Sequence, residues 1–137
     1  MLILEAILHQ LLKVVPNVPP ETGGIIGGRK GIISHFWLDF GNIYDMYIPN
    51  IERINQIISD WQETNIKFYG IFHSHFPGNE NLSFGDKRYI IKIMKALPPD
   101  IKRLYFPIIF PRESMISYRA EINNRHIIIV REPTEII

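Results

Sequence analysis

Apolar residues recur at intervals of three and four positions in three segments of the chain. The first segment runs from Met1 to about Val14 and is stopped by the prolines that follow it. The second runs from Ile51 to Trp61, with Asn50 as the expected N-cap, and the third from about Phe84 to Leu97. Because this spacing gathers apolar side chains on one face of a helix, the pattern predicts three amphipathic helices.

The segments between these helices are rich in β-branched and aromatic residues or alternate between apolar and polar positions, which is typical of strands. Short turns are expected at Gly28 to Gly31 and at Asn123-Asn124. The order of elements favours an α+β fold, in which a mixed, mostly antiparallel sheet is flanked by about three helices. The expected strands are Gly23–Gly27, Gly31–Phe40, about Asn42–Ile48, Lys67–His75, Leu104–Phe110, Ile116–Ile122 and His126–Val130.

Composition limits the classes of protein that fit this pattern. The chain has 137 residues, 46% hydrophobic and 21% charged, which predicts a single globular domain over residues 1–137. Its net charge of +1 argues against nucleic acid or an anionic membrane as a partner. Without cysteine there is no thiolate zinc site and no cysteine nucleophile. The apolar N-terminus carries Glu5 and His9 and lacks a basic start, so we expect a cytoplasmic protein rather than a secreted one.

His73-Ser74-His75 is the segment with the clearest chemistry. Alternate side chains of a strand share a face, so His73 and His75 project together and could hold one metal ion. Asp86 follows in the first turn of the third predicted helix, on the same stripe as Ile90 and Ile93, and should therefore face inward. An inward carboxylate needs a cation or hydrogen bonds, and a metal held by the histidines would supply that partner.

Other interpretations of these residues remain open. Ser83-x-x-Asp86 is close to a capping box, which needs no catalysis, and two strand histidines can be satisfied by carbonyl groups or water. Taken together, two histidines and one aspartate leave the fourth tetrahedral position free, as in catalytic zinc sites. Glu21 is the candidate general base, although its local pattern fits an exposed acid at the start of a strand better.

The whole set resembles the JAMM motif of the JAB1/MPN/Mov34 metalloproteases, and in particular the compact prokaryotic JAB-domain type. The motif consists of a glutamate before a glycine-rich strand, then His-Ser-His, seven residues, a serine, two residues and an aspartate. Family members often carry proline where this chain has Phe76 and Leu82, a difference that touches no ligand. The resemblance implies a single JAB/MPN-like domain with a cytidine-deaminase-like architecture.

The resemblance also implies roles for the five residues. His73, His75 and Asp86 would bind one Zn²⁺ per chain, with a catalytic water as the fourth ligand. Glu21 would take a proton from that water and pass it to the leaving amine, while the Ser83 hydroxyl would stabilise the oxyanion. The other histidines, His9, His35 and His126, are not expected to be ligands, and Trp37 and Trp61 are expected to pack in or near the core.

The activity implied is that of a zinc-dependent isopeptidase or peptidase. Its expected substrate is a ubiquitin-like or sulfur-carrier-type protein or a conjugate of one, and a narrow channel suited to glycine would favour that substrate. Two alternatives stay open, a non-catalytic MPN-type protein-interaction module and a zinc amidohydrolase of a small molecule. We expect no nucleic-acid and no membrane partner, and the apolar first helix leaves a homodimer as an option.

Overall fold

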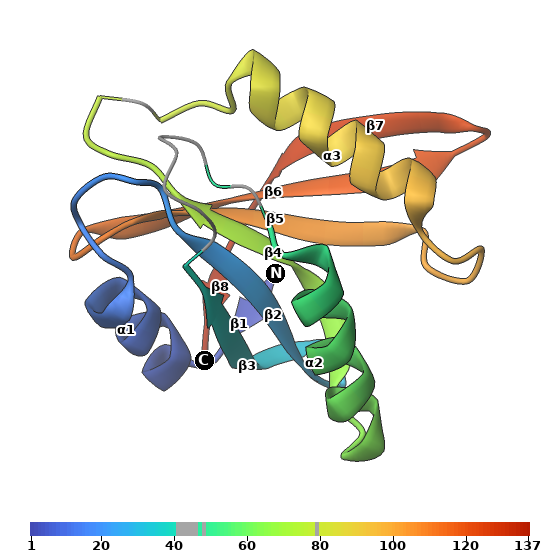
Figure 1. Cartoon of the computed structure of the whole chain (residues 1–137), viewed down its shortest axis with the longest axis horizontal. Coiled ribbons are helices and arrows are strands. Elements are labelled where there is room, and N and C mark those ends of the chain that lie inside the picture. The colour runs from blue at the N-terminus through green and yellow to red at the C-terminus, as the bar shows by residue number, and fades with distance from the viewer. Residues whose placement is uncertain (41–46, 48, 79) are drawn as a thin grey trace.

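The computed structural model describes residues 1–40, 47, 49–78 and 80–137, and the strand expected at about Asn42–Ile48 lies largely outside them. Within these residues the fold is α+β, with three helices and one eight-stranded mixed sheet (Figure 1). The elements in chain order are β1 (Leu2–Ile3), α1 (Glu5–Val14), β2 (Gly23–Arg29), β3 (Ile32–Asp39), α2 (Ile51–Glu63), β4 (Lys67–Ser74), α3 (Phe84–Ala96), β5 (Arg103–Phe110), β6 (Ser114–Asn123), β7 (His126–Glu132) and β8 (Glu135–Ile136).

The strands lie in the order β7-β6-β5-β4-β2-β3-β1-β8. Antiparallel pairing joins β2 to both β3 and β4, and β6 to both β5 and β7. Parallel pairing joins β4 to β5, and β1 to β3 and β8. The expectation of a mixed sheet is confirmed, and β4, which carries the histidine segment, lies in its middle.

Two hydrophobic cores lie on the two faces of the sheet. Neighbouring strand residues alternate between them, as the period of a strand requires. Ile25 and Ile71 pack in the core that contains side chains of α2 and α3. Ile26 and Phe72 pack in the other core, with α1. The face that carries Ile71 also carries His73, two residues further along β4, so the histidine projects toward the side of α2 and α3.

The start of the chain differs from the sequence prediction. The helix was expected from Met1, but it begins at Glu5, and Leu2–Ile3 form the strand β1 instead. Leu2 pairs with Ile32 of β3 and with Glu135 of β8. These partners are distant in sequence, and their pairing overrides the local helical pattern. No helix among the described residues is long and apolar enough to cross a membrane.

Both predicted turns are found, one of them shifted. Lys30 and Gly31 connect β2 and β3 with positive φ angles of 55° and 78°, which suits a tight hairpin turn. The second turn was expected at Asn123-Asn124, yet Asn123 pairs with His126. The residues that turn are therefore Asn124 and Arg125, with φ angles of 50° and 68°.

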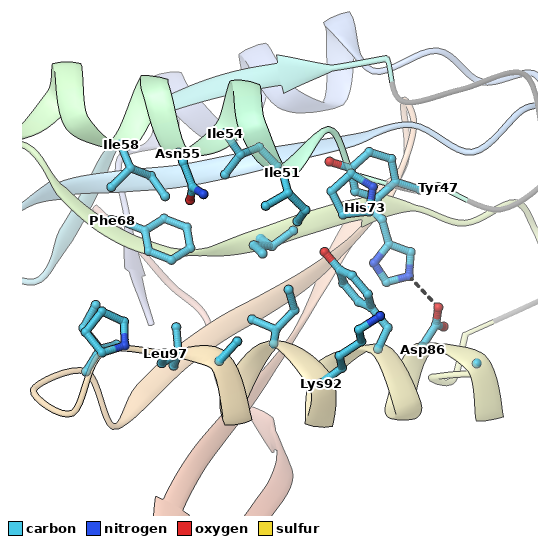
Figure 2. A pocket seen from close by; sticks show the side chains of 18 of the residues that line it. Tyr47, Ile51, Ile54, Asn55, Ile58, Phe68, His73, Asp86, Lys92 and Leu97 are labelled. Carbon is cyan, nitrogen blue, oxygen red and sulfur yellow. Dashed lines mark ion pairs between the residues drawn. The ribbon is translucent and has the colours of Figure 1, made fainter.

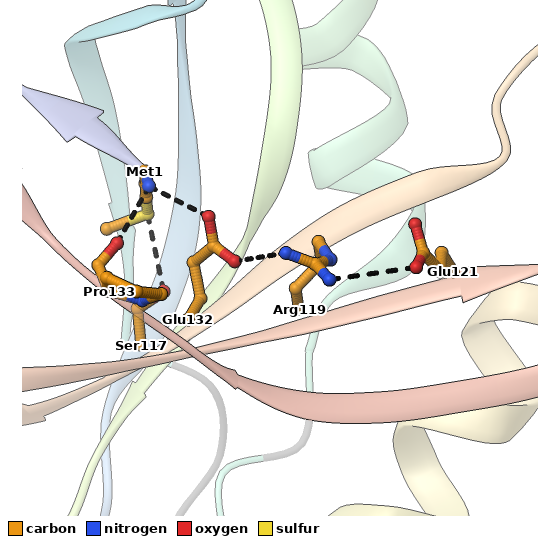
Figure 3. Close-up of polar contacts among 6 residues, drawn as sticks. All are labelled: Met1, Ser117, Arg119, Glu121, Glu132 and Pro133. Atoms are coloured by element: carbon orange, nitrogen blue, oxygen red, sulfur yellow. Dashed lines mark hydrogen bonds and ion pairs between the residues drawn. The ribbon is translucent and has the colours of Figure 1, made fainter.

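Polar contacts fasten the first residue to the far end of β7 (Figure 3). The amino group of Met1 donates to Glu132 Oε1 at 2.9 Å and to the carbonyl of Pro133 at 2.8 Å. The hydroxyl of Ser117 donates to Met1 Sδ at 3.4 Å. Arg119 of β6 donates to the second carboxylate oxygen of Glu132. Glu132 therefore joins strands β6 and β7 to the region of β1.

Candidate metal centre

His73 and His75 come from the end of β4 and the residue just beyond it. Both are buried, with exposed fractions of 8% and 1%. The backbone N–H of His75 donates to the carbonyl of Ile109 at 3.0 Å, so the chain still follows β5 after β4 has ended. As the sequence predicted, the two side chains share one side, and their Nε2 atoms lie 2.9 Å apart.

Asp86 is brought to the histidines by the start of α3. Ser83 is the N-cap, and its Oγ accepts from the Asp86 N–H at 3.0 Å while Asp86 Oδ2 accepts from the Ser83 N–H at 2.9 Å. This reciprocal pair is a capping box, the structural interpretation that the sequence left open. Asp86 also faces inward as expected and is 8% exposed.

The three expected ligands converge on one point. His73 Nε2 lies 3.3 Å from Asp86 Oδ1, and His75 Nε2 lies 3.1 Å from Asp86 Oδ2 (the His73 contact is dashed in Figure 2). Around a tetrahedral zinc with bonds of about 2.0–2.1 Å, neighbouring ligand atoms lie about 3.3 Å apart. The two nitrogens and the Asp86 carboxylate are near enough to share a zinc ion, and each histidine contacts a different oxygen of that carboxylate.

Glu21 lies beside the same histidines, although it is 52 residues earlier than His73 in the chain. Strand pairing explains its position, because Gly23 of β2 is opposite His73. One ligand atom from each of Glu21, His73 and His75 lies within 4.8 Å of the others. Glu21 is therefore close to the histidines, which its local sequence could not show. Either Glu21 or Asp86 could supply an oxygen as the third metal ligand beside the two histidine nitrogens.

Ser74 holds the Glu21 segment in place. Its Oγ accepts from the backbone N–H of Thr22 at 2.8 Å, and its own N–H donates to the Thr22 carbonyl at 2.7 Å. Both Ser74 and Thr22 are buried. From the sequence, Ser74 was placed only on the opposite side of the strand from the histidines. The structure shows that its hydroxyl, on that side, fixes the residue next to Glu21.

The pKa values of the two carboxyl groups are shifted in opposite directions. Burial raises the pKa of Glu21, and the nearby histidines offset this only in part. Burial would also raise the pKa of Asp86, but hydrogen bonds to His73 and His75 outweigh it and hold that pKa well below its ordinary range. When the pKa values of two neighbouring carboxyl groups are pushed apart, the group with the lower pKa stays ionised and the group with the higher pKa can take up and release a proton. These directions agree with the roles that the resemblance implies, Asp86 as a ligand and Glu21 as the base.

Ser83 is exposed at the start of α3, and the helix cap uses its hydroxyl oxygen rather than its hydroxyl hydrogen. Its oxygen accepts the capping bond from Asp86, and within the described residues its hydrogen is given to no acceptor. A hydroxyl can accept and donate at the same time. The capping role and a role beside the reaction are therefore compatible.

Tyr47, a residue that the sequence did not point to, lies next to Glu21. Tyr47 donates from its hydroxyl to Asp39 Oδ2 at 2.9 Å, and its ring packs against Gly23. A Cβ on Gly23 would lie 2.4 Å from Tyr47 Cε2 and 2.5 Å from the Phe72 carbonyl. The glycine after Glu21 thus lets this ring and the neighbouring backbone approach β2. The glycine run was the available signal, but the sequence did not identify what packs against it.

The remaining histidines and both tryptophans lie where the sequence predicted. His9 is exposed on α1 and 3.9 Å from Glu5, His35 contacts the Ser34 hydroxyl, and His126 is exposed. In the described part of the chain these three belong to no group of metal-ligating side chains. Trp37 and Trp61 are partly buried and pack against the core on the α2 and α3 side.

Comparison with solved structures supports the fold. A protein from Desulfitobacterium hafniense, solved in solution, superposes with a TM-score of 0.67 at 18% identity, over 98% of this chain and 91% of that one. A Salinibacter ruber protein, also solved in solution, gives 0.60 at 14% identity, over 98% and 90%. No family model and no curated protein matches this chain. This chain is therefore similar to both proteins in fold, and at these identities the likeness shows the fold alone.

Proposed function

We propose that this protein is a zinc-dependent peptidase or isopeptidase with the JAB/MPN, cytidine-deaminase-like architecture. Its substrate would be an amide bond at the C-terminus of a ubiquitin-like or sulfur-carrier-type protein in a conjugate. One observation carries the proposal: two imidazole nitrogens and a buried carboxylate converge, with a second carboxylate of raised pKa beside them. The order of these residues in the chain is the one that resembles the JAMM motif.

His73, His75 and Asp86 are the residues that would hold zinc. When bound, zinc supplies a Lewis acid for the scissile carbonyl and lowers the pKa of water at the site toward neutrality. Asp86 is suited to a ligand because its pKa is low and its carboxylate is already fixed by the helix start.

Glu21 and Ser83 would act on the substrate and the water. Glu21 accepts a proton from the attacking water and delivers it to the nitrogen that leaves as an amine. Burial raises the pKa of Glu21, which makes its carboxylate a stronger base than that of an exposed glutamate. Ser83 donates its free hydroxyl hydrogen to the carbonyl oxygen as negative charge develops on it.

Glu21→Gln tests the proposal. The probe is a peptide ending in Gly-Gly joined to a lysine side chain by an isopeptide bond, with release of the lysine followed by mass spectrometry. The wild type reconstituted with zinc should cleave it, and Glu21→Gln should retain zinc but lose about 10²- to 10⁴-fold in kcat. The matched control is Glu80→Gln, since Glu80 is exposed and lies outside the site.

Two results would contradict the proposal. Full activity in Glu21→Gln would remove the proposed base from the mechanism. A zinc-loaded wild type that cleaves no amide, protein-linked or small, would favour the non-catalytic interaction module instead. Cleavage of a small amide but not of the isopeptide would favour the small-molecule amidohydrolase.

A further inference from the structure

A cavity of about 590 Å³ lies between α2 and α3, and the candidate metal centre is at one end of it. Glu21, His73 and Asp86 all line this cavity, so it is continuous with the proposed site of hydrolysis. Figure 2 shows His73 and Asp86 at one end and Leu97 far along α3 at the other. Its volume is within the range of about 300–1,000 Å³ that ligand pockets have.

The walls between these ends are apolar. Ile51 and Ile58 line the cavity from α2 and Phe68 lines it from β4. Ile93 of α3 and Leu97, the C-cap of that helix, line the other side. A tail made of glycine needs only a narrow channel and would leave these side chains facing water. The room and the apolar walls fit a large hydrophobic group instead, whose burial removes apolar surface from water.

The Tyr89 side chain also lines the cavity, and its hydroxyl lies buried at the wall. Among the described residues, this hydroxyl has no hydrogen-bond partner. A buried hydroxyl without a partner is uncommon, because the group has given up its hydrogen bonds to water. A polar atom of a bound substrate would satisfy it, and a few such groups in an apolar pocket fix the orientation of a ligand.

We propose that this cavity binds a bulky apolar side chain that lies close to the scissile amide, and that the Tyr89 hydroxyl hydrogen-bonds to the backbone of the same substrate. The inference rests on the proposed function, which it deepens by naming the substrate class. Among the amides that this site would cleave, the preferred substrate is a chain with a large hydrophobic residue close to the cleaved bond.

The test uses acetylated hexapeptide amides of glycine and serine, in which one leucine or phenylalanine is moved through the positions. Cleavage by the zinc-reconstituted wild type is followed by mass spectrometry. We expect kcat/KM to rise by about 10- to 200-fold when the apolar residue stands at one fixed distance from the cleaved bond, the gain that a fitting hydrophobic pocket provides.

Asn55→Trp should abolish this preference. Asn55 is exposed on α2 and its amide points into the cavity (Figure 2), so a tryptophan there fills the space without disturbing the core. Gln56→Trp is the matched control, because Gln56 is exposed on the same helix and does not line the cavity.

Tyr89→Phe separates a positioning role from a structural one. It should raise KM for the apolar peptides about 3- to 10-fold, as expected for one neutral hydrogen bond, and leave the unfolding midpoint unchanged or higher. An unchanged KM or a lower midpoint would overturn the role of Tyr89.

The peptide series distinguishes failure of the inference from failure of the function. Equal cleavage of all peptides, or the same preference in Asn55→Trp as in the wild type, would overturn the inference and leave the hydrolase standing. Cleavage of the Gly-Gly isopeptide but of no hexapeptide would overturn the inference alone. Cleavage of neither would contradict the proposed function and this inference with it.

Discussion

Ser83 combines a structural role, capping α3, with a proposed role in the reaction. Its oxygen caps α3 by accepting the Asp86 N–H, and within the described part of the chain its hydrogen has no acceptor. We propose that this hydrogen is donated to the substrate. Substitution can separate helix capping from the proposed catalytic role, because alanine and glycine both remove the hydroxyl but differ in how far they destabilise the start of the helix.

We predict that Ser83→Ala and Ser83→Gly lose activity alike but differ in stability. Both remove the hydroxyl, so kcat should fall by about 10²- to 10³-fold in each. Loss of the cap should cost about 1 kcal/mol in Ser83→Ala and only a few tenths in Ser83→Gly. Peptide cleavage and urea unfolding measure the two effects. Wild-type activity in the glycine variant would show that Ser83 only caps the helix.

The positions of individual site residues were predictable to different degrees. His73 and His75 were placed by the period of a strand, and the inward Asp86 by the stripe it shares with Ile90 and Ile93 on α3. These are local patterns, which a single sequence contains. The position of Glu21 depends on pairing between β2 and β4, and rested on the family resemblance alone. Metal binding by these residues stays a prediction.

Hydroxyl partners were not predictable from the sequence. The Ser74 hydroxyl accepts from the backbone of Thr22, whereas the Tyr89 hydroxyl has no hydrogen-bond partner among the described residues. The sequence around Ser74 and Tyr89 does not indicate this difference. Such partners are set by how strands and helices pack in three dimensions, where residues far apart in sequence meet.

At the scale of elements, the helices and long strands follow their hydrophobic patterns closely. The capping box at α3 and the Asn50 cap of α2, which accepts the Arg53 N–H at 3.1 Å, were both readable from the sequence. The two-residue strands β1 and β8 were not, since they exist only through pairing with each other and with β3. A strand of two residues is too short to show the alternation of apolar and polar positions that would distinguish it from an adjoining helix.

The contacts of Glu132, at the end of β7, should make the stability of the protein depend on pH. Burial would raise its pKa, but the Met1 amino group and Arg119 outweigh that effect and lower it from the ordinary value of 4.5. A lowered pKa in the folded state contributes stability above that ordinary value, and the contribution is lost as the pH falls through the folded pKa.

Glu132→Gln should therefore destabilise the protein at pH 7 and not at low pH. We expect a loss of about 1–3 kcal/mol at pH 7, typical of hydrogen bonds to a charged group, which shrinks toward zero as the pH falls well below 4.5. Denaturant unfolding across this range measures it. Glu121→Gln is the control, because Glu121 is 3.7 Å from Arg119 and more exposed, and should cost less than about 0.5 kcal/mol. Equal, pH-independent losses in both variants would contradict this account.

At the scale of the whole molecule, the sheet assembles a site from three distant segments. Glu21 precedes β2, the histidines end β4, and Asp86 opens α3. The antiparallel pairing of β2 with β4 brings the first two together, and α3 lies against the same face and supplies the third. The same arrangement leaves the cavity between α2 and α3 open at the histidines. Fold class was predictable from the order of elements, whereas this cavity was not, because it depends on the spacing of two helices.

The central claim is that His73, His75 and Asp86 together bind zinc. It is tested most directly by zinc content after gel filtration, measured by inductively coupled plasma mass spectrometry on wild type, Glu21→Gln and Asp86→Asn. Asparagine keeps the shape of the side chain and an oxygen that can accept the Ser83 N–H, so the start of α3 is retained.

We predict one zinc per chain in the wild type and in Glu21→Gln. In Asp86→Asn zinc binding should be weaker by more than about 100-fold, since even residues that only support ligands cost 10- to 100-fold when lost. A folded wild type that binds no zinc, or an Asp86→Asn variant that binds it as tightly as the wild type, would contradict the account.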